Sequence, residues 1–312
     1  MGLLRGAALA AGGAVGAGLA LTGYAAAEAR AYTLRRFEVP VLPPGHRPLR
    51  VLHLTDLHMT PGQRRKQQWV RSLAALEPDL VIDTGDNLAH REAVPAVLDA
   101  LGPLLDLPGA FVHGSNDYFE PGMRNPLRYL MPDSGHRYVS KPQLPWRDLT
   151  AGLTGAGWLD LTNTRSPLDV GDLRLAFAGL DDPHLGYDDL AAVAGQADAD
   201  ADLRIGVAHA PYLRVLDQLA GDGYDLLLAG HTHGGQVRLP WPGGSRALAT
   251  NCDLEPARAR GLHRHPADSS PGDPGSAWLE VCAGLGTNPY VRIRVACRPE
   301  AALLTLVPRE RG

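Results

Sequence analysis

The chain contains 312 residues, of which 45% are hydrophobic and 21% are charged, and its formal net charge is -4 at neutral pH. This length allows a sizeable buried core, and the composition is ordinary for a globular protein. A nucleic-acid-binding surface normally shows a basic excess, so the acidic balance argues against a nucleic-acid partner.

The N-terminal segment between Arg5 and Glu28 carries no charge and consists mainly of Ala, Gly, Leu and Val. Roughly 20 such residues can span a bilayer as a helix. Ala25-Ala26-Ala27 is similar to a signal-peptidase site, so an uncleaved anchor, a cleaved export signal and a disordered tail are all open interpretations. We predict a transmembrane anchor or signal segment over residues 1–30. We expect this segment to anchor the protein in the membrane. Arginines lie on both sides of it, so charge does not set its orientation, and an extracytoplasmic catalytic domain is an open alternative.

A proline-rich linker is predicted over residues 31–48, and a regular pattern begins at Leu49. Apolar runs predict strands at residues 50–55, 80–83 and 110–113, with helices at 64–76 and 91–105 between them. Strands that alternate with helices indicate βαβ units and an α/β fold. In such sheets, ligands gather at the carboxyl ends of the strands.

The second half of the chain is less periodic. A helix end and a strand are expected within residues 153–162, and a hairpin over 168–178 that turns at Gly171-Asp172. Further strands are predicted at 204–208, 226–229, 278–282 and 301–307, a helix at 212–219, and a surface loop at 258–275. The three cysteines lack zinc-ligand spacing, so packed thiols are expected, with one disulfide open if the domain is exported. They are Cys252, Cys282 and Cys297.

Several predicted strands end at residues that can bind a metal. Each such residue alone has an ordinary explanation, because Gly-Asp after a strand is usually a turn and a lone histidine is usually structural. Five such strand ends in order are hard to explain by chance. The residues are Asp56 and His58, then Asp86, then Asn116, then His209, and finally His231 with His233.

The last of these strand ends is the segment Gly230-His231-Thr232-His233-Gly234-Gly235-Gln236. Its glycines allow a tight turn, so both imidazoles can point into one small volume. Neutral imidazole is the commonest protein metal ligand. The pair therefore indicates either one metal held by both histidines or two metals with one histidine each.

This order of motifs resembles the calcineurin-like metallophosphoesterase superfamily. The GHTHGGQ segment, the later Ala283-Gly284-Leu285-Gly286-Thr287, Arg292 and Cys297-Arg298-Pro299-Glu300 are together similar to its membrane-associated bacterial phosphodiesterase branch. The resemblance runs from about Leu49 to Pro308. It implies a four-layer α/β/β/α sandwich that binds two metal ions, with a catalytic domain over residues 49–312.

The resemblance also implies a role for each motif residue. Asp56, His58 and His233 would hold the first metal, and Asp86 would bridge to the second. Asn116, His209 and His231 would complete the second site. Carboxylate and imidazole ligands without thiolate suit Mn²⁺, Fe or Zn²⁺. Two such metals would generate a bridging hydroxide that attacks phosphorus in line with the leaving oxygen.

One turn departs from the family pattern, which is usually Gly-Asn-His-Asp. Here it is Gly114-Ser115-Asn116-Asp117. Strict alignment puts Ser115 in the ligand position, whereas a shift by one residue keeps Asn116 on the metal. We favour Asn116, because an amide oxygen is a better neutral ligand than an alcohol. The usual histidine acid is absent, and the candidates to replace it are His113 and His184, although ordinary loop histidines are the simpler interpretation of both.

The predicted function is a metal-dependent phosphohydrolase that acts on a phosphodiester, a pyrophosphate or a phosphomonoester. A membrane-anchored enzyme would act on a lipid-linked or cell-envelope phosphate, a substrate expected only by analogy. Arg292 is a candidate to bind a substrate phosphate, although a surface ion pair is the simpler interpretation. The altered turn at Ser115 motivates the alternative, a weakly active or inactive metal-binding scaffold at the membrane.

Overall fold

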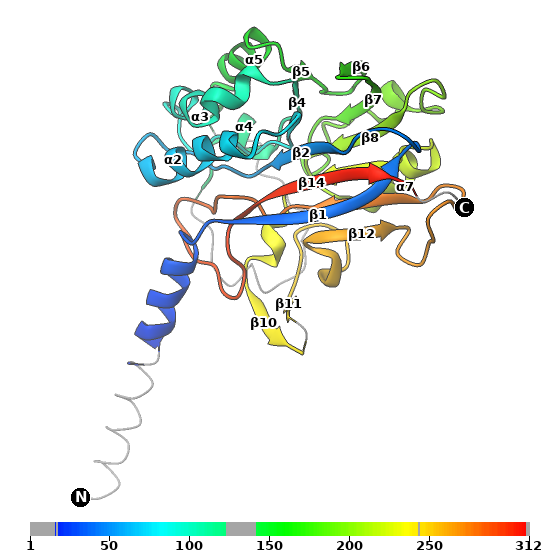
Figure 1. Ribbon diagram of the computed structural model, residues 1–312. Coiled ribbons are helices and arrows are strands. Elements are labelled where there is room, and N and C mark those ends of the chain that lie inside the picture. Colours follow the sequence, from blue (N-terminus) through cyan, green and yellow to red (C-terminus); the bar gives the residue numbers. More distant parts are fainter. Residues whose placement is uncertain (1–15, 17, 123–141, 243, 310–312) are drawn as a thin grey trace, which may run out of the picture.

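Two six-stranded β-sheets pack face to face in the computed structural model, which describes residues 16, 18–122, 142–242 and 244–309 (Figure 1). The first sheet has the order β1 (Thr33–Leu42), β14 (Glu300–Pro308), β2 (Leu49–Leu54), β3 (Leu80–Asp83), β4 (Gly109–Phe111) and β5 (Leu159–Asp160). The second has the order β12 (Gly261–His265), β13 (Ala277–Val281), β9 (Leu226–Ala229), β8 (Leu203–Ala208), β7 (Leu173–Leu180) and β6 (Thr164–Val170). A separate hairpin consists of β10 (Arg238–Trp241) and β11 (Gly244–Ala247).

Four consecutive strands of each sheet are parallel. In the first sheet β2, β3, β4 and β5 run parallel, and in the second β7, β8, β9 and β13 do so. The carboxyl ends of the parallel strands in each sheet therefore meet at one edge. The loops that carry the predicted metal ligands leave from these edges.

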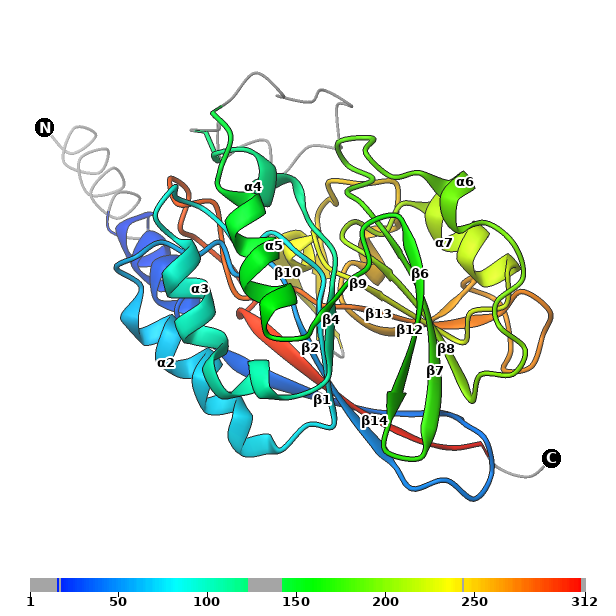
Figure 2. The same cartoon turned by 90° about the horizontal axis from the view of Figure 1, so that it is seen from above.

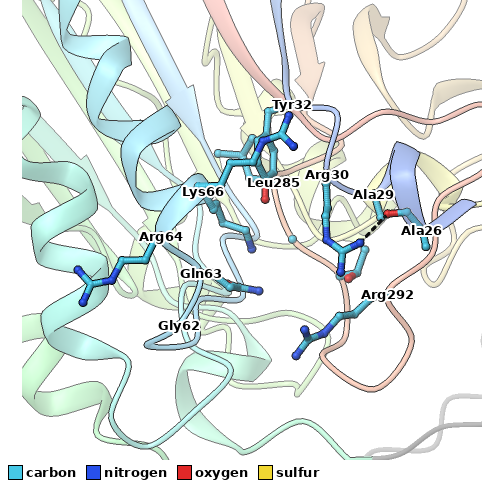
Figure 3. A pocket seen from close by; sticks show the side chains of 13 residues that line it. Ala26, Ala29, Arg30, Tyr32, Gly62, Gln63, Arg64, Lys66, Leu285 and Arg292 are labelled. Atoms are coloured by element: carbon cyan, nitrogen blue, oxygen red, sulfur yellow. Dashed lines mark hydrogen bonds between the residues drawn. The ribbon is translucent and has the colours of Figure 1, made fainter.

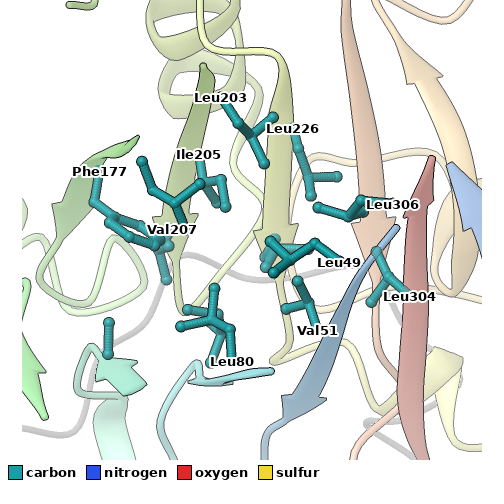
Figure 4. Packing of buried hydrophobic residues seen from close by; sticks show 14 of the residues in the cluster. Leu49, Val51, Leu80, Phe177, Leu203, Ile205, Val207, Leu226, Leu304 and Leu306 are labelled. Carbon is teal, nitrogen blue, oxygen red and sulfur yellow. The ribbon is translucent and has the colours of Figure 1, made fainter. Parts of the chain in front are cut away.

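Three apolar cores hold the layers together. The central core lies between the sheets, where Val51 and Leu80 of the first face Phe177 and Ile205 of the second (Figure 4). A second core joins the first sheet to helices α2, α3 and α5, and a third joins the second sheet to α6 and α7 (Figure 2). The helices thus cover the outer faces of both sheets in four layers. Their bounds are α2 (Arg64–Ser72), α3 (Val94–Leu101), α4 (Ser115–Tyr118), α5 (Trp146–Gly155), α6 (Leu190–Val193) and α7 (Leu213–Gly221), with short 3₁₀ helices η1 (Leu73–Leu76), η2 (Gly102–Asp106), η4 (His233–Gly235) and η5 (Pro256–Arg258).

Most of the predicted elements are confirmed. The seven strands predicted from apolar runs correspond to β2, β3, β4, β8, β9, β13 and β14. Strands β6 and β7 form the predicted hairpin with its turn at Gly171-Asp172. The helix predicted over 91–105 begins only at Val94, as α3, and ends as η2. All three cysteines are buried free thiols, as expected.

The predicted linker over residues 31–48 is wrong in its central part, which forms β1. This strand pairs in parallel with β14 along almost its whole length. Val39, Val41 and Leu42 are buried in the core between the sheets. Pro40 is compatible with the strand because β1 lies at the edge of its sheet. Proline lacks a backbone N–H, and on the open side of an edge strand no neighbouring strand requires that donor.

The predicted surface loop over residues 258–275 is also corrected, because it contains β12. This edge strand pairs antiparallel with β13, and Leu262 packs against the central core. Charged side chains on an edge strand hinder pairing with other chains, which explains its polar sequence.

The predicted N-terminal membrane segment lies largely outside the described residues, which exclude 1–15 and 17. Residues 18–28 form a helix with exposed Leu19, Leu21 and Tyr24. At its end, the Glu28 carboxylate accepts a hydrogen bond from the backbone of Cys297 at 2.6 Å. Among the described residues, no helix combines the length and the apolar character that a membrane crossing requires.

Candidate metal centre

The loops that follow four parallel strands bring six of the predicted ligands together. Each loop begins at the carboxyl end of its strand, so the edges of both sheets contribute. Asp56 and His58 follow β2, Asp86 follows β3, His209 follows β8, and His231 and His233 follow β9. All but His233 are buried, and the side chain of His233 is only 11% exposed.

Asp56, His58 and His233 form one group of potential ligand atoms, all within 4.8 Å of one another. The Nε2 atoms of His58 and His233 lie 3.2 Å apart. Oδ1 of Asp56 lies 3.8 Å from Nε2 of His58 and 3.6 Å from Nε2 of His233.

Asp56, Asp86 and His209 form a second such group. Asp86 lies between the two groups, because its Oδ2 is 3.5 Å from Nε2 of His58 and its Oδ1 is 3.5 Å from Nε2 of His209. Nδ1 of His231 lies 3.1 Å from Nε2 of His209. Asp86 therefore lies between two pairs of histidines. His58 and His233 lie on one side of it, and His209 and His231 lie on the other.

The donor set fits divalent cations. Oδ1 of Asp56 and Nε2 of His231 are buried and have no hydrogen-bond partner among the described residues. A buried polar atom without a partner costs free energy, and a cation bound to Oδ1 of Asp56, near Nε2 of His58 and of His233, would remove that cost. The donors are carboxylate oxygens and imidazole nitrogens, which suit such ions.

Burial and neighbouring charges shift the pKa values of the clustered side chains. Burial lowers the pKa of His58 to about 3 and places those of His231 and His233 well below the usual value, so these imidazoles are neutral. Burial raises the pKa of Asp56 to about 6. Burial also lowers the pKa of His209, but the nearby carboxylates, Asp86 first, outweigh it and raise the value to about 9. A protonated His209 thus supplies positive charge where a cation would lie.

The backbone at the centre is strained. Of the nine described non-glycine residues with positive φ, five are predicted ligands. Such a conformation costs roughly 1–3 kcal/mol per residue and occurs mostly at functional sites. The five are Asp56, His58, Asp86, His231 and His233, with φ between 39° and 67°.

Asp117 connects the Asp86 turn to the altered turn. Its carboxylate accepts hydrogen bonds from the backbone of Asp86 at 2.9 Å, Asn87 at 2.8 Å and Gly114 at 3.0 Å. Asn116 donates to both oxygens of Asp86, from its backbone and from its side-chain amide, each at 2.7 Å. The Asn116 side chain therefore lies at the centre.

Ser115 points in a different direction, with its hydroxyl hydrogen-bonded to Oδ2 of Asp182. Asp182 is fully buried and also accepts from the backbone of His184 at 2.8 Å. Burial raises the pKa of Asp182 to about 6, and its charge contributes to the raised pKa of His209. Asp182 is thus a further carboxylate near the centre that sequence reasoning missed, although its place directly after β7 could have indicated it.

The structure separates the two candidate acids. Nε2 of His113 lies 2.8 Å from the Thr150 hydroxyl, and the ring packs against Tyr118 and Trp146, so it faces α5. The ring of His184, by contrast, lies 4.4 Å from that of His231, centroid to centroid. Only His184 of this pair has a ring contact with a predicted ligand.

Arg294 is a second residue that sequence reasoning missed. It is fully buried and donates to the carbonyls of Ala283 at 2.7 Å, Gly284 at 3.0 Å and Gly286 at 2.8 Å. This fixes the 283–287 loop against the Asp56 turn. Gly284 has φ +65°, and a Cβ there would lie 2.5 Å from that of Asp56, so only glycine fits. Arg292, in contrast, is exposed.

Comparison with known proteins gives consistent matches. The family profile described as calcineurin-like phosphoesterase matches residues 49–235. The "Transmembrane protein with metallophosphoesterase domain" of Bos taurus is 28% identical over 215 residues, which cover 64% of this chain and 44% of that protein. The chain therefore spans less than half the length of this relative.

Two bacterial relatives match over most of their length. The metallophosphoesterase YkoQ of Bacillus subtilis (strain 168) is 24% identical over 257 residues, which cover 82% of this chain and 83% of that protein. The UDP-2,3-diacylglucosamine pyrophosphatase LpxG of Chlamydia trachomatis serovar D is 26% identical over 292 residues, with the same two coverages of 82% and 83%.

Proposed function

Because the chain belongs to the calcineurin-like phosphoesterase family, it is a metal-dependent phosphoric ester hydrolase, and we propose that its clustered side chains hold two divalent metal ions. Asp56, His58 and His233 would hold the first ion, and Asn116, His209 and His231 the second. Asp86 would bridge them. The observation that carries this proposal is the position of Asp86, 3.5 Å from a nitrogen of His58 and of His209.

Bound divalent metals would supply a nucleophile at neutral pH and polarise the phosphoryl oxygens. Mn²⁺, Fe and Zn²⁺ all match the donor set. The neutral imidazoles of His58, His231 and His233 can bind without losing a proton, because their pKa values are lowered by burial. Asn116 would hold Asp86 in place through its two hydrogen bonds.

His184 is our candidate for the group that protonates the leaving oxygen. Its ring is in contact with that of His231, at the second metal position, and its side chain is partly exposed, so a substrate can reach it. His113 faces Thr150 and aromatic rings, which is a structural environment.

The substrate class that we propose is a phosphodiester or pyrophosphate linked to a lipid or to cell-envelope material. It is supported by the relative named as a UDP-2,3-diacylglucosamine pyrophosphatase and by one named as a transmembrane protein. A position at the membrane is part of this proposal.

The test is hydrolysis of a chromogenic phosphodiester with Mn²⁺, together with a count of bound metal. Wild type should turn over and bind about two ions per chain, whereas Asp86→Asn should lose about 10²-fold or more in rate and lower the metal count. Asp169→Asn, at an exposed position of β6, is the matched control and should behave as wild type. Equal rates for wild type and Asp86→Asn would exclude the enzyme mechanism, and metal binding without turnover would favour a scaffold.

A further inference from the structure

A basic cavity of about 310 Å³ opens where the N-terminal helix joins the two-sheet domain (Figure 3). It is lined by residues 26–32 near the helix end, by the first turn of α2 and by the 285–287 loop. Five cationic side chains and no acidic side chain of the described residues line it. The cations are Arg30, Arg64, Arg65, Lys66 and Arg292.

The basic cavity borders the metal centre but is distinct from it. Lys66, which is only 3% exposed, donates from Nζ to the carbonyl of Leu57 at 2.5 Å, between the predicted ligands Asp56 and His58. Gly286 lies against the other side of the same turn, where an added Cβ would be 2.6 Å from that of His58. None of the six clustered ligands lines the basic cavity.

The cations of the basic cavity have no acidic partner within the described ranges of the chain. Arg30 donates to the carbonyl of Ala26 at 3.4 Å, and Arg292 to that of Pro289 at 2.8 Å. Burial and then the charges of Arg294 and Arg292 lower the pKa of Lys66 to about 7, so like charges are crowded here. An anion in the cavity would offset this repulsion.

The side chains are arranged to receive such an anion. In Figure 3, Arg30, Gln63 and Arg292 point toward the same space, while Arg64 extends away from it. Guanidinium groups form bidentate hydrogen bonds with phosphate oxygens, and Gln63 adds an amide donor. The positive end of the α2 dipole contributes at the same point.

We propose that the basic cavity binds the phosphate group of an anionic ligand, at a site separate from the metal centre. The phosphate belongs either to a soluble phosphate compound or to the headgroup of an anionic phospholipid. Tyr24, 50% exposed on the helix that ends at the cavity, and Tyr290, 56% exposed and two residues before Arg292, are side chains typical of a lipid interface. The proposal does not depend on the activity of the metal centre.

The test uses the full chain stripped of metal with a chelator, so that bound metals add no affinity for phosphate. Inorganic phosphate is titrated by calorimetry, and co-sedimentation compares vesicles of phosphatidylcholine alone with vesicles that also contain phosphatidylglycerol. Binding of inorganic phosphate identifies a soluble ligand, whereas binding only to the phosphatidylglycerol vesicles identifies the headgroup. The difference between the vesicle types excludes binding by the apolar helix alone.

The double variant Arg30→Gln/Arg292→Gln should weaken binding of the responding probe by about tenfold or more. Both residues are exposed, so the fold should be retained. The matched control is Arg47→Gln/Arg174→Gln, which removes two positive charges near the β6–β7 turn, beside Asp172 and Asp198, and should bind as wild type does. If wild type binds neither probe, if the double variant binds as tightly as wild type, or if both double variants lose binding equally, the proposal is overturned.

Discussion

The raised pKa of His209 couples its protonation to metal binding. Burial disfavours its charged form, but Asp86, Asp182 and Asp56 together raise the pKa of His209 to about 9. An imidazole must be neutral to bind a metal. Metal binding at the proposed second position would therefore release this proton.

The affinity for Mn²⁺ should consequently rise with pH between about pH 7 and pH 8.5, by at most about tenfold per pH unit for one released proton. Asp56, with a pKa of about 6, is already ionised in this window, and the pKa values of His58, His231 and His233 lie well below it. Calorimetric titration in buffers of different ionisation enthalpy measures both the affinity and the protons released. A flat affinity without proton release would contradict the role of His209.

His184 and His113 allow a matched comparison. A general acid matters most when the leaving group is poor, and its contribution is typically about 10²–10⁴-fold. His184→Gln should therefore lower kcat by about 10²-fold for an alkyl phosphodiester and much less for a nitrophenyl one. His113→Gln should change both rates by the same factor, because its ring packs against Tyr118 and Trp146 away from the ligands. A selective loss in His113→Gln instead would reverse the assignment.

The clustering of six predicted ligands could be foreseen from the sequence, because each lies shortly after a strand with a clear apolar pattern. The roles of Asp182 and Arg294 depend on tertiary contacts that the sequence does not show, although the position of Asp182 shortly after β7 marks it as a candidate. Asp182 accepts a hydrogen bond from the hydroxyl of Ser115, which follows a strand of the other sheet. Arg294 donates hydrogen bonds to three carbonyls of a neighbouring loop. Neither contact leaves a local pattern in the sequence.

At the scale of elements, the inner strands were predictable, whereas the edge strands β1 and β12 were not. Strands buried on both faces have apolar runs, which are Leu80-Val81-Ile82 in β3 and Leu226-Leu227-Leu228-Ala229 in β9. Edge strands expose one side and carry proline or charge, as β1 and β12 do. The sequences of these edge strands are therefore similar to those of linkers and loops, and only the pairing with a neighbouring strand identifies them.

The assignment of β1 to the sheet can be tested by mutation. Leu42 is fully buried in the core between the sheets, so Leu42→Ala should lower the free energy of unfolding by about 2–5 kcal/mol. Glu38→Ala, at an exposed position of the same strand, should change it by less than about 0.5 kcal/mol. Urea unfolding measures both values. Similar small effects would mean that the segment behaves as a linker in solution.

At the scale of the whole molecule, the candidate metal centre lies where loops of the two sheets meet. Asp56, His58 and Asp86 follow strands of the first sheet, whereas His209, His231 and His233 follow strands of the second. The central core also joins the sheets, with buried side chains from both. We therefore expect the sandwich to assemble without metal ions, which would add a second connection at its edge.

Removal of metal should lower the melting temperature without loss of a cooperative transition. Ligands that bind only the folded state stabilise it by RT ln(1 + [L]/Kd), about 2.7 kcal/mol at a hundredfold excess over Kd. Chelator-treated protein should thus melt at a lower temperature, keep its far-ultraviolet circular dichroism at room temperature, and recover its melting temperature when Mn²⁺ is added. Asp86→Asn should respond weakly to the same additions, because the carboxylate between the two groups of histidines is lost. An equal response of Asp86→Asn and wild type would place the stabilising metal elsewhere on the molecule.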